Sequence, residues 1–231
     1  MEVSAWLTKG LEDSPLTEDA VDYLKGRGAT DRIIEEWGIK VWDPPLTPCP
    51  DERLHRHYGT HFDRFEGKAI YPLLSPKGRF LGFDSRHIDR KDDVRYLLPE
   101  SRWNPVWVNM PGAMDRIWSG SDIMVVEGRY DVLAMIQLAE ARGSKIAILG
   151  SGPAHLSYKQ MGFLKRWALG KIWMAYDNDP AGKKGTADAV EFAKKARLNL
   201  QPIRYGKLSD DPGALWDRGG VELLDQEFPH F

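Results

Sequence analysis

Two stretches in the second half of the chain decide its fold: IMVVEGRYD, residues 123–131, and KIWMAYDNDPAG, residues 171–182. Each opens with a short apolar run and becomes acidic where that run ends. Short apolar strands separated by helix-length segments predict a parallel sheet with helices on each side, so we expect an α/β unit over residues 118–206. The expected strands are 123–126, 145–149, 171–176 and 202–205, and the expected helices are 131–142 and 181–197.

The first half of the chain has a pattern typical of an α+β fold. Residues 17–37 predict two short helices, and residues 43–52 contain four prolines, which predict an extended loop. Apolar residues on both sides of a Pro-Lys-Gly turn predict a β-hairpin over residues 68–86. We therefore expect an α+β subdomain over residues 1–117 ahead of the α/β unit, and a short C-terminal segment over residues 207–231.

The composition is that of a globular protein. The chain has 231 residues, of which 42% are hydrophobic and 29% charged, and no apolar run approaches the length of a membrane span. The N-terminus lacks the features of a secretory signal, so we expect a cytoplasmic protein with no membrane partner. The only cysteine, Cys49, excludes an internal disulfide and a four-ligand structural zinc site within this sequence.

The net charge of −2 is unevenly distributed. Residues 1–52 hold 5 Lys and Arg against 12 Asp and Glu, residues 53–116 hold 12 against 8, and residues 117–231 hold 15 against 14. The basic middle segment is compatible with a phosphate-binding face, although an excess of this size also fits an ordinary solvated surface.

Carboxylates follow two of the predicted strands, at the point where each strand ends. Glu127 and Asp131 belong to the first stretch, and Asp177 and Asp179 belong to the second. Because ligands bind at the carboxyl ends of parallel strands, we expect these side chains to face one site. Hard divalent cations prefer such oxygen ligands and assist phosphoryl transfer. Either motif alone also fits a polar turn or a helix N-cap, so the prediction of a metal site rests on the pair.

At these residues the sequence resembles a known family. Residues 122–206 are similar to the Toprim domain of bacterial DnaG-type primases, topoisomerases and small nucleases. Three further segments resemble primases specifically: 27–39, which is similar to the Arg-Gly-Leu-Ser helix pair of the primase catalytic core, 69–86, and 95–100, which reads RYLLPE. The resemblance covers about residues 20–220.

The resemblance implies a role for each matching acidic residue. Glu127, Asp177 and Asp179 would be catalytic and would bind the metals, Mg²⁺ or Mn²⁺, and Asp131 would support them. The family also has an Asp-Pro-Asp element, which appears here as Asp-Asp-Pro-Gly over residues 210–213. In it, Asp211 would be a further metal ligand, and Asp210 would stand in for the missing second aspartate.

The resemblance also implies positions that bind nucleotide or template. These are Arg27, Lys68, Arg86, Arg95 and Gly150, the last in a turn suited to phosphate binding. Two departures from the family alter this part of the site. Asp84 and Ser85 replace two glycines, and residues 103–108 lack the usual Lys-Gly, so Trp103 and Trp107 are candidates for base stacking.

These features predict a DNA primase catalytic core that synthesises short RNA primers on single-stranded DNA from ribonucleoside triphosphates. The resemblance further implies a replicative helicase and a separate zinc-binding domain as partners, and the compact size suggests a phage or mobile-element primase. A Toprim nuclease or topoisomerase-like enzyme is an alternative, although only about 25 residues follow the Toprim segment. A non-catalytic Toprim binding module is the third possibility.

Overall fold

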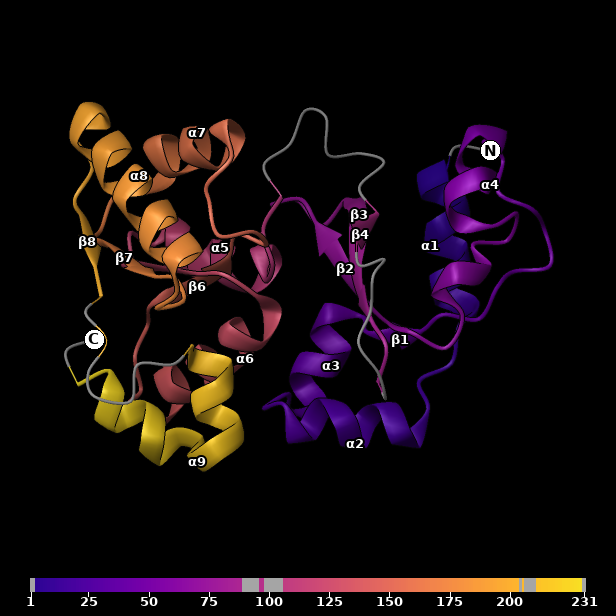
Figure 1. Cartoon of the computed structure of the whole chain (residues 1–231), viewed down its shortest axis with the longest axis horizontal. Helices are drawn as coiled ribbons and strands as arrows, with labels where there is room; N and C mark the ends of the chain where they lie inside the picture. Colours follow the sequence, from indigo (N-terminus) through magenta and orange to yellow (C-terminus); the bar gives the residue numbers. More distant parts are fainter. Residues whose placement is uncertain (1–2, 89–95, 98–105, 204, 206–210, 230–231) are drawn as a thin grey trace. The chain divides into compact units, whose positions relative to one another are not determined.

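A computed structural model describes residues 3–88, 96–97, 106–203, 205 and 211–229 (Figure 1). The chain forms two compact units. The first unit comprises Met1–Lys25, Ala29–Leu74 and Gly78–Asn104, and the second comprises Gly26–Gly28, Ser75–Lys77 and Pro105–Phe231. Among the described residues, none of the helices combines the length and apolar character needed to cross a membrane.

The first unit combines short helices with an antiparallel sheet of strand order β1-β2-β3-β4, as expected for an α+β fold. Its helices are α1 (Val3–Asp13), α2 (Glu18–Gly26), α3 (Asp31–Trp37), α4 (Glu52–Tyr58) and the 3-10 helix η1 (Asp63–Phe65). Its strands are β1 (Lys40–Val41), β2 (Ala69–Leu74), β3 (Phe80–Arg86) and β4 (Tyr96–Leu97). The β2–β3 hairpin, the α2–α3 pair and the proline-rich loop confirm the sequence predictions, whereas α1 and α4 were not predicted.

An aromatic cluster holds the first unit together. Trp6 of α1, Trp42 after β1 and Phe83 of β3 are almost fully buried and pack with Phe62 and Phe65. The rings of Phe65 and Phe83 meet edge to face with centroids 4.9 Å apart, a favoured geometry for aromatic pairs. Most of the tryptophans and phenylalanines of this half therefore serve packing rather than ligand binding.

The second unit contains the predicted parallel sheet, with strand order β6-β5-β7-β8. Its strands are β5 (Ile123–Val126), β6 (Ala147–Gly150), β7 (Ile172–Ala175) and β8 (Leu200–Pro202). Its helices are α5 (Met110–Trp118), α6 (Arg129–Ala141), α7 (Tyr158–Trp167), α8 (Pro180–Ala196) and α9 (Pro212–Glu227). The α/β fold class is confirmed. The last strand lies earlier than the predicted 202–205, and the C-terminal segment forms the helix α9.

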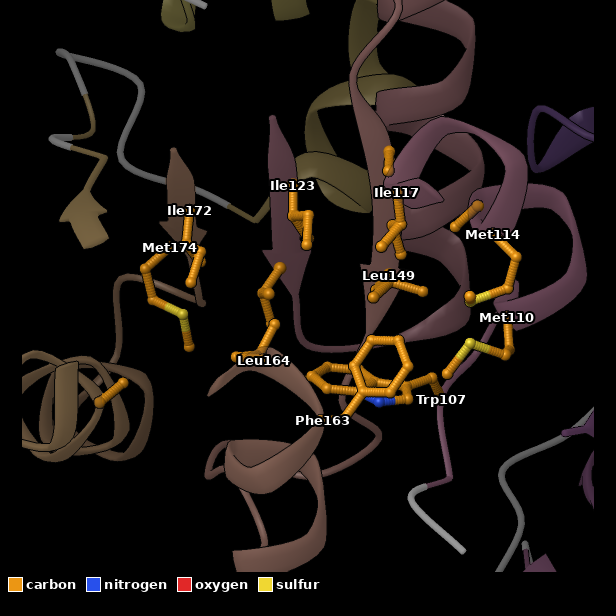
Figure 2. Packing of buried hydrophobic residues seen from close by; sticks show 14 of the residues in the cluster. Trp107, Met110, Met114, Ile117, Ile123, Leu149, Phe163, Leu164, Ile172 and Met174 are labelled. Atoms are coloured by element: carbon orange, nitrogen blue, oxygen red, sulfur yellow. The ribbon is translucent and has the colours of Figure 1, made fainter. Parts of the chain in front are cut away.

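Helix α5 belongs to the core of this second unit (Figure 2). Met110, Met114 and Ile117 pack with Leu149 of β6 and with Phe163 of α7. By compactness, α5 lies in the second unit, which includes Pro105–Phe231. The sequence Met-Pro-Gly at 110–112 is read most easily as a turn, but its proline occupies the first turn of the helix, where proline is well tolerated.

Trp107 corrects one of the sequence predictions. Its side chain is 1% exposed and packs against Phe163 in the core, with ring centroids 5.9 Å apart. A buried ring of this kind cannot stack on a base, so the proposed stacking role is wrong for Trp107. The other candidate, Trp103, lies outside the described residues.

Candidate active site at the sheet edge

The register of the parallel sheet brings the two acidic motifs to one edge. Val126 of β5 is paired with Ala175 of β7 on one side and with Gly150 of β6 on the other. Glu127 follows β5 directly, and Asp177 lies two residues beyond the end of β7. Both carboxylates therefore extend from the carboxyl ends of adjacent strands, as predicted.

Asp177 has the most perturbed environment of these residues. Its Oδ1 atom is buried, and none of the described residues donates a hydrogen bond to it. Burial, together with the negative charges of four neighbouring carboxylates, raises the pKa of Asp177 to about 8, and burial has the largest effect. In order of effect, these neighbours are Asp131, Glu127, Asp211 and Asp179. These four carboxylates thus lie within electrostatic range of Asp177, whose buried Oδ1 has no hydrogen-bond donor among the described residues.

Asp131 links two helices beneath this site. Its Oδ2 accepts a hydrogen bond of 2.7 Å from the N–H of Gly128, and its Oδ1 accepts one of 3.0 Å from the N–H of Gly213 in α9. Burial and the charge of Asp211 raise the pKa of Asp131, the two backbone donors lower it, and Glu127 raises it. Asp131 is therefore built into the scaffold, which is compatible with its expected supporting role.

Asp179 and Asp211 are held by helix caps. Asp179 Oδ1 accepts from Gly182 N at 2.7 Å at the start of α8, and Asp211 Oδ1 accepts from Ala214 N at 2.6 Å at the start of α9. A Cβ atom at position 182 would overlap the carbonyl oxygen of Asp177, so only glycine permits this close approach. The caps fix one oxygen of each carboxylate and orient both residues at the helix N-termini.

The carboxylate oxygens of these side chains are suitable ligands for a divalent cation, but the side chains are not arranged as a complete coordination sphere. Across the described residues, no group of three or more His, Cys, Asp or Glu side chains is positioned to hold a metal ion. The buried Oδ1 of Asp177 and the mutual repulsion among the carboxylates nevertheless make this edge favourable for positive charge. A bound divalent cation would remove this repulsion.

The turn after β6 does not provide the expected phosphate site. The N–H of Gly150 donates to the carbonyl of Val108 at 3.2 Å, the N–H of Ser151 donates to Val126 at 3.0 Å, and the N–H of Gly152 donates to Glu127 at 2.9 Å. These donors are already engaged within the protein. The structure gives another reason for the glycine at 150, since a Cβ atom there would lie 2.9 Å from the side chain of Val132.

The predicted basic residues have different environments. Lys68 is 2% exposed and lies over the ring of Phe65, so its ammonium is not on a surface that a template could reach. Arg86 is half-buried at the end of β3. Arg27 belongs to the second unit, where it forms an ion pair with Asp217 of α9. Arg95 and the acidic Asp210 lie outside the described residues.

The sequence analysis missed Tyr205 beside the acidic cluster. Its hydroxyl donates to the carbonyl of Ala175 at 3.2 Å, and its ring meets Phe228 edge to face with centroids 5.5 Å apart. Burial raises the pKa of Tyr205, and the nearby carboxylates, Asp131 first among them, raise it further. A single tyrosine after a strand gives no sequence signal for this position, because its contacts are with Ala175 of β7 and with Phe228, which lie far from it in the sequence.

A groove of about 650 Å³ lies elsewhere on the second unit, along one side of α8. Its lining includes Leu156, Met161, Ala181, Lys184 and Phe192. None of the predicted site residues lines it. The candidate site is therefore defined by the acidic sheet edge and not by this groove.

Comparisons with known proteins agree with the strand-end motifs. Residues 124–213 match the family model Toprim_2, described as Toprim-like. The DNA primase of Deinococcus radiodurans is 26% identical over an alignment of 230 residues. The match covers 90% of this chain and 39% of the relative. The DNA primase of Pseudomonas aeruginosa is 27% identical and is matched over 34% of its length. The chain thus spans between a third and two fifths of these relatives.

Solved structures show the same fold. A DnaG primase catalytic domain bound to ssDNA is 20% identical, with a TM-score of 0.70 over 97% of this chain and 78% of that one. The E. coli primase catalytic core is also 20% identical, with a TM-score of 0.68 over 97% of this chain and 77% of that one. The chain therefore resembles bacterial DNA primases in sequence, carries a Toprim-like domain, and has the fold of the DnaG primase catalytic core.

Proposed function

We propose that the chain is the catalytic core of a DNA primase, which joins ribonucleoside triphosphates into a short RNA primer on a single-stranded DNA template. The observation that carries the proposal is the buried, unpaired Oδ1 of Asp177 among carboxylates at the carboxyl edge of a Toprim-like sheet. The primase relatives support it. We expect a cytoplasmic enzyme of a bacterium or a phage-infected cell.

The acidic edge would hold Mg²⁺ or Mn²⁺ through Glu127, Asp177 and Asp179, with Asp211 as a further ligand. Such cations offset the charge of the transferring phosphates and increase the acidity of the attacking 3′-hydroxyl. The chain's own contribution is to place these oxygens. The caps at Gly182 and Ala214 each hold one carboxylate oxygen, and Asp131 ties the N-terminus of α9 to that of α6.

The protonation of Asp177 also determines the pH at which all carboxylates of the site are negatively charged. With a pKa of about 8, this carboxyl is largely protonated at neutral pH in the absence of a cation. Binding of a divalent ion would therefore displace a proton from it. This predicts cation binding that strengthens as the pH rises from 6 to about 8.

Basic residues would bind the phosphates of template and nucleotide. Arg27, Arg86 and Arg95 are the candidates for this role, because phosphate contacts supply most of the affinity for nucleic acid. One relative of known structure contains zinc-binding and RNA polymerase domains, and we propose that this core works with such a domain and with a replicative helicase.

The test is de novo synthesis on single-stranded templates of varied sequence with labelled ribonucleotides and Mg²⁺ or Mn²⁺. Glu127→Gln and Asp177→Asn should abolish synthesis while leaving the folded state intact by circular dichroism. Asp188→Asn, which removes an exposed carboxylate of α8, is the matched control and should retain activity. Undiminished synthesis by both site variants would contradict the proposal, and metal-dependent cleavage of labelled DNA without nucleotide incorporation would favour a nuclease.

A further inference from the structure

Arg27 is held by two side chains from different helices of the second unit. Its Nη1 forms an ion pair with Oδ2 of Asp217 in α9. Its guanidinium carbon also lies 5.0 Å from the centre of the Tyr130 ring in α6, within the range of a cation–π interaction. The segment Gly26–Gly28 belongs to the second unit, so these contacts lie within one compact body.

The backbone next to Arg27 is also packed against α9. Gly28 has a φ of +86°, which side-chain-bearing residues rarely adopt, and a Cβ atom there would lie 2.9 Å from Cε2 of Trp216. Trp216 immediately precedes Asp217 in α9. The Arg-Gly pair thus rests on two consecutive residues of this helix, through the arginine side chain and the glycine backbone.

The same helix is connected to the acidic edge. Asp211 caps its N-terminus, and Gly213 donates the hydrogen bond of 3.0 Å to Asp131. Tyr130, which lies beneath the guanidinium of Arg27, immediately precedes Asp131. The first half of α9 and the start of α6 therefore join Arg27 to the carboxylates in one hydrogen-bonded and ion-paired scaffold.

We propose that Asp217 is a positioning residue that holds the Arg27 guanidinium ready for a phosphate group of the template or nucleotide. This inference rests on the proposed function, because it takes nucleic acid and nucleoside triphosphates as the ligands of Arg27. The Arg27 side chain is 34% exposed, so solvent and ligands can reach it while the ion pair is formed.

The physical reason is preorganisation. An arginine side chain has many rotamers in solution, and ordering it when a ligand binds costs free energy. If an ion pair and an aromatic contact already order the side chain before the ligand binds, this cost is smaller. Asp217 also reduces the net positive charge near Arg27, which opposes phosphate binding. We infer that ordering is the larger effect, because two contacts and the glycine backbone converge on this one side chain.

Two measurements test this: equilibrium binding of a fluorescently labelled single-stranded oligodeoxynucleotide, and the KM and kcat for ribonucleotides in primer synthesis. Asp217→Asn should weaken oligonucleotide binding and raise KM by about two- to tenfold, the range expected for one rotamer-rich side chain that must be ordered. The kcat should change less than KM. Asp217→Glu, which keeps the charge, should restore most of the affinity.

A double-mutant cycle separates positioning from general stability. Arg27→Gln should weaken binding at least as much as Asp217→Asn, and adding Asp217→Asn to Arg27→Gln should have no further effect. The matched control is Asp225→Asn, which removes another ion pair of α9, with Arg142, and should leave affinity unchanged. If Asp217→Asn does not fold, Tyr130→Leu and Tyr130→Phe test the positioning of Arg27 through its aromatic contact. Weaker oligonucleotide binding is then expected only for Tyr130→Leu.

The possible results distinguish the positioning role of Asp217 from the phosphate-binding role of Arg27 and from the proposed function. Unchanged or tighter binding by Asp217→Asn, or additive effects of the two substitutions, would overturn the positioning role while leaving the proposed function intact. If Arg27→Gln leaves affinity unchanged, the phosphate-binding role of Arg27 and this inference both fail. If the wild-type chain binds oligonucleotide but makes no RNA on any template, the proposed function fails, and the cycle still decides whether Asp217 acts through Arg27.

Discussion

The carboxylate of Asp131 accepts a hydrogen bond of 3.0 Å from the backbone N–H of Gly213, across 82 residues of sequence. Its other oxygen accepts from Gly128, so one buried side chain satisfies donors at the N-termini of both α6 and α9. Because Glu127 precedes Gly128 and Asp211 lies two residues before Gly213, this pair of bonds sets the separation of two candidate metal ligands.

Asp131→Ala should therefore lower both stability and cation binding. It leaves two backbone N–H groups without their acceptor, and each such loss costs about 1–3 kcal/mol when the group stays buried. We expect a decrease of about 2–4 kcal/mol in the free energy of unfolding, measured by urea denaturation. Asp188→Ala, at an exposed position of α8, should change stability by less than about 0.5 kcal/mol. An unchanged denaturation midpoint for Asp131→Ala would contradict this account.

The stability of the cation-free protein should fall as the pH rises. The pKa of Asp177 in the folded state is about 8 and its ordinary value is 3.8. Between these values the folded state keeps a proton that the unfolded state has released, so the free energy of unfolding decreases with increasing pH. Above about pH 8 this contribution no longer changes.

The measurement is the urea midpoint of wild type and of Asp177→Asn from pH 5 to pH 9. The wild-type curve should lose up to about 1.4 kcal/mol per pH unit relative to the variant, because the asparagine cannot titrate. Saturating Mg²⁺ should abolish this difference in slope if the ion binds the deprotonated carboxylate. Parallel curves without the ion would show that the pKa of Asp177 is not raised.

Any side chain at position 182 should displace the backbone of Asp177. Gly182→Ala places a methyl group against the carbonyl of Asp177, so the first turn of α8 must shift away from the site. We expect a stability loss of about 1–3 kcal/mol and weaker cation binding, measured by calorimetric titration with Mn²⁺. Gly162→Ala is the control: nothing lies within 4 Å of its added carbon on the exposed side of α7, and it should raise stability by about 0.5–1 kcal/mol.

The far ends of α6 and α9 are joined by Arg142. Its Nε donates to Asp225 Oδ1 at 2.8 Å, and its Nη1 donates to the carbonyl of Phe228 at 2.8 Å. Arg142→Met should cost about 1–3 kcal/mol, since a carbonyl near the end of α9 loses a charged donor. Asp225→Asn should cost less, because the Phe228 contact remains. Thermal unfolding with primer synthesis as a second readout checks both, and we expect synthesis by the folded variants to persist.

Gly150→Ala distinguishes packing from phosphate binding. The added carbon would lie 2.9 Å from Val132 and 3.0 Å from Val108, so we expect a lower melting temperature. Because the N–H of residue 150 is already bonded to Val108, the affinity of the folded fraction for ribonucleotides should not change. A selective loss of nucleotide affinity at wild-type stability would restore the phosphate-binding role.

Much of the second unit could be predicted because its strands are short, apolar and buried. Short apolar runs separated by helix-length segments are typical of strands in a parallel sheet. The acidic residues that follow β5 and β7 could be placed at one edge by the rule that ligands bind at the carboxyl ends of parallel strands. Other elements gave no such signal. Helix α5 begins with Met-Pro-Gly, and its assignment to the second core depends on contacts with β6 and α7 that no local pattern contains.

The sequence by itself determined that strands and helices alternate along the second half of the chain, and it identified acidic residues at the strand ends, because local periodicity and turn chemistry encode both. Only the tertiary structure decided what those residues do there. Burial beside four other carboxylates raises the pKa of Asp177, and backbone donors from two helices make Asp131 part of the scaffold. Arg27 and its partner Asp217 are 190 residues apart. Such contacts depend on how helices pack, and packing is a property of the folded chain as a whole.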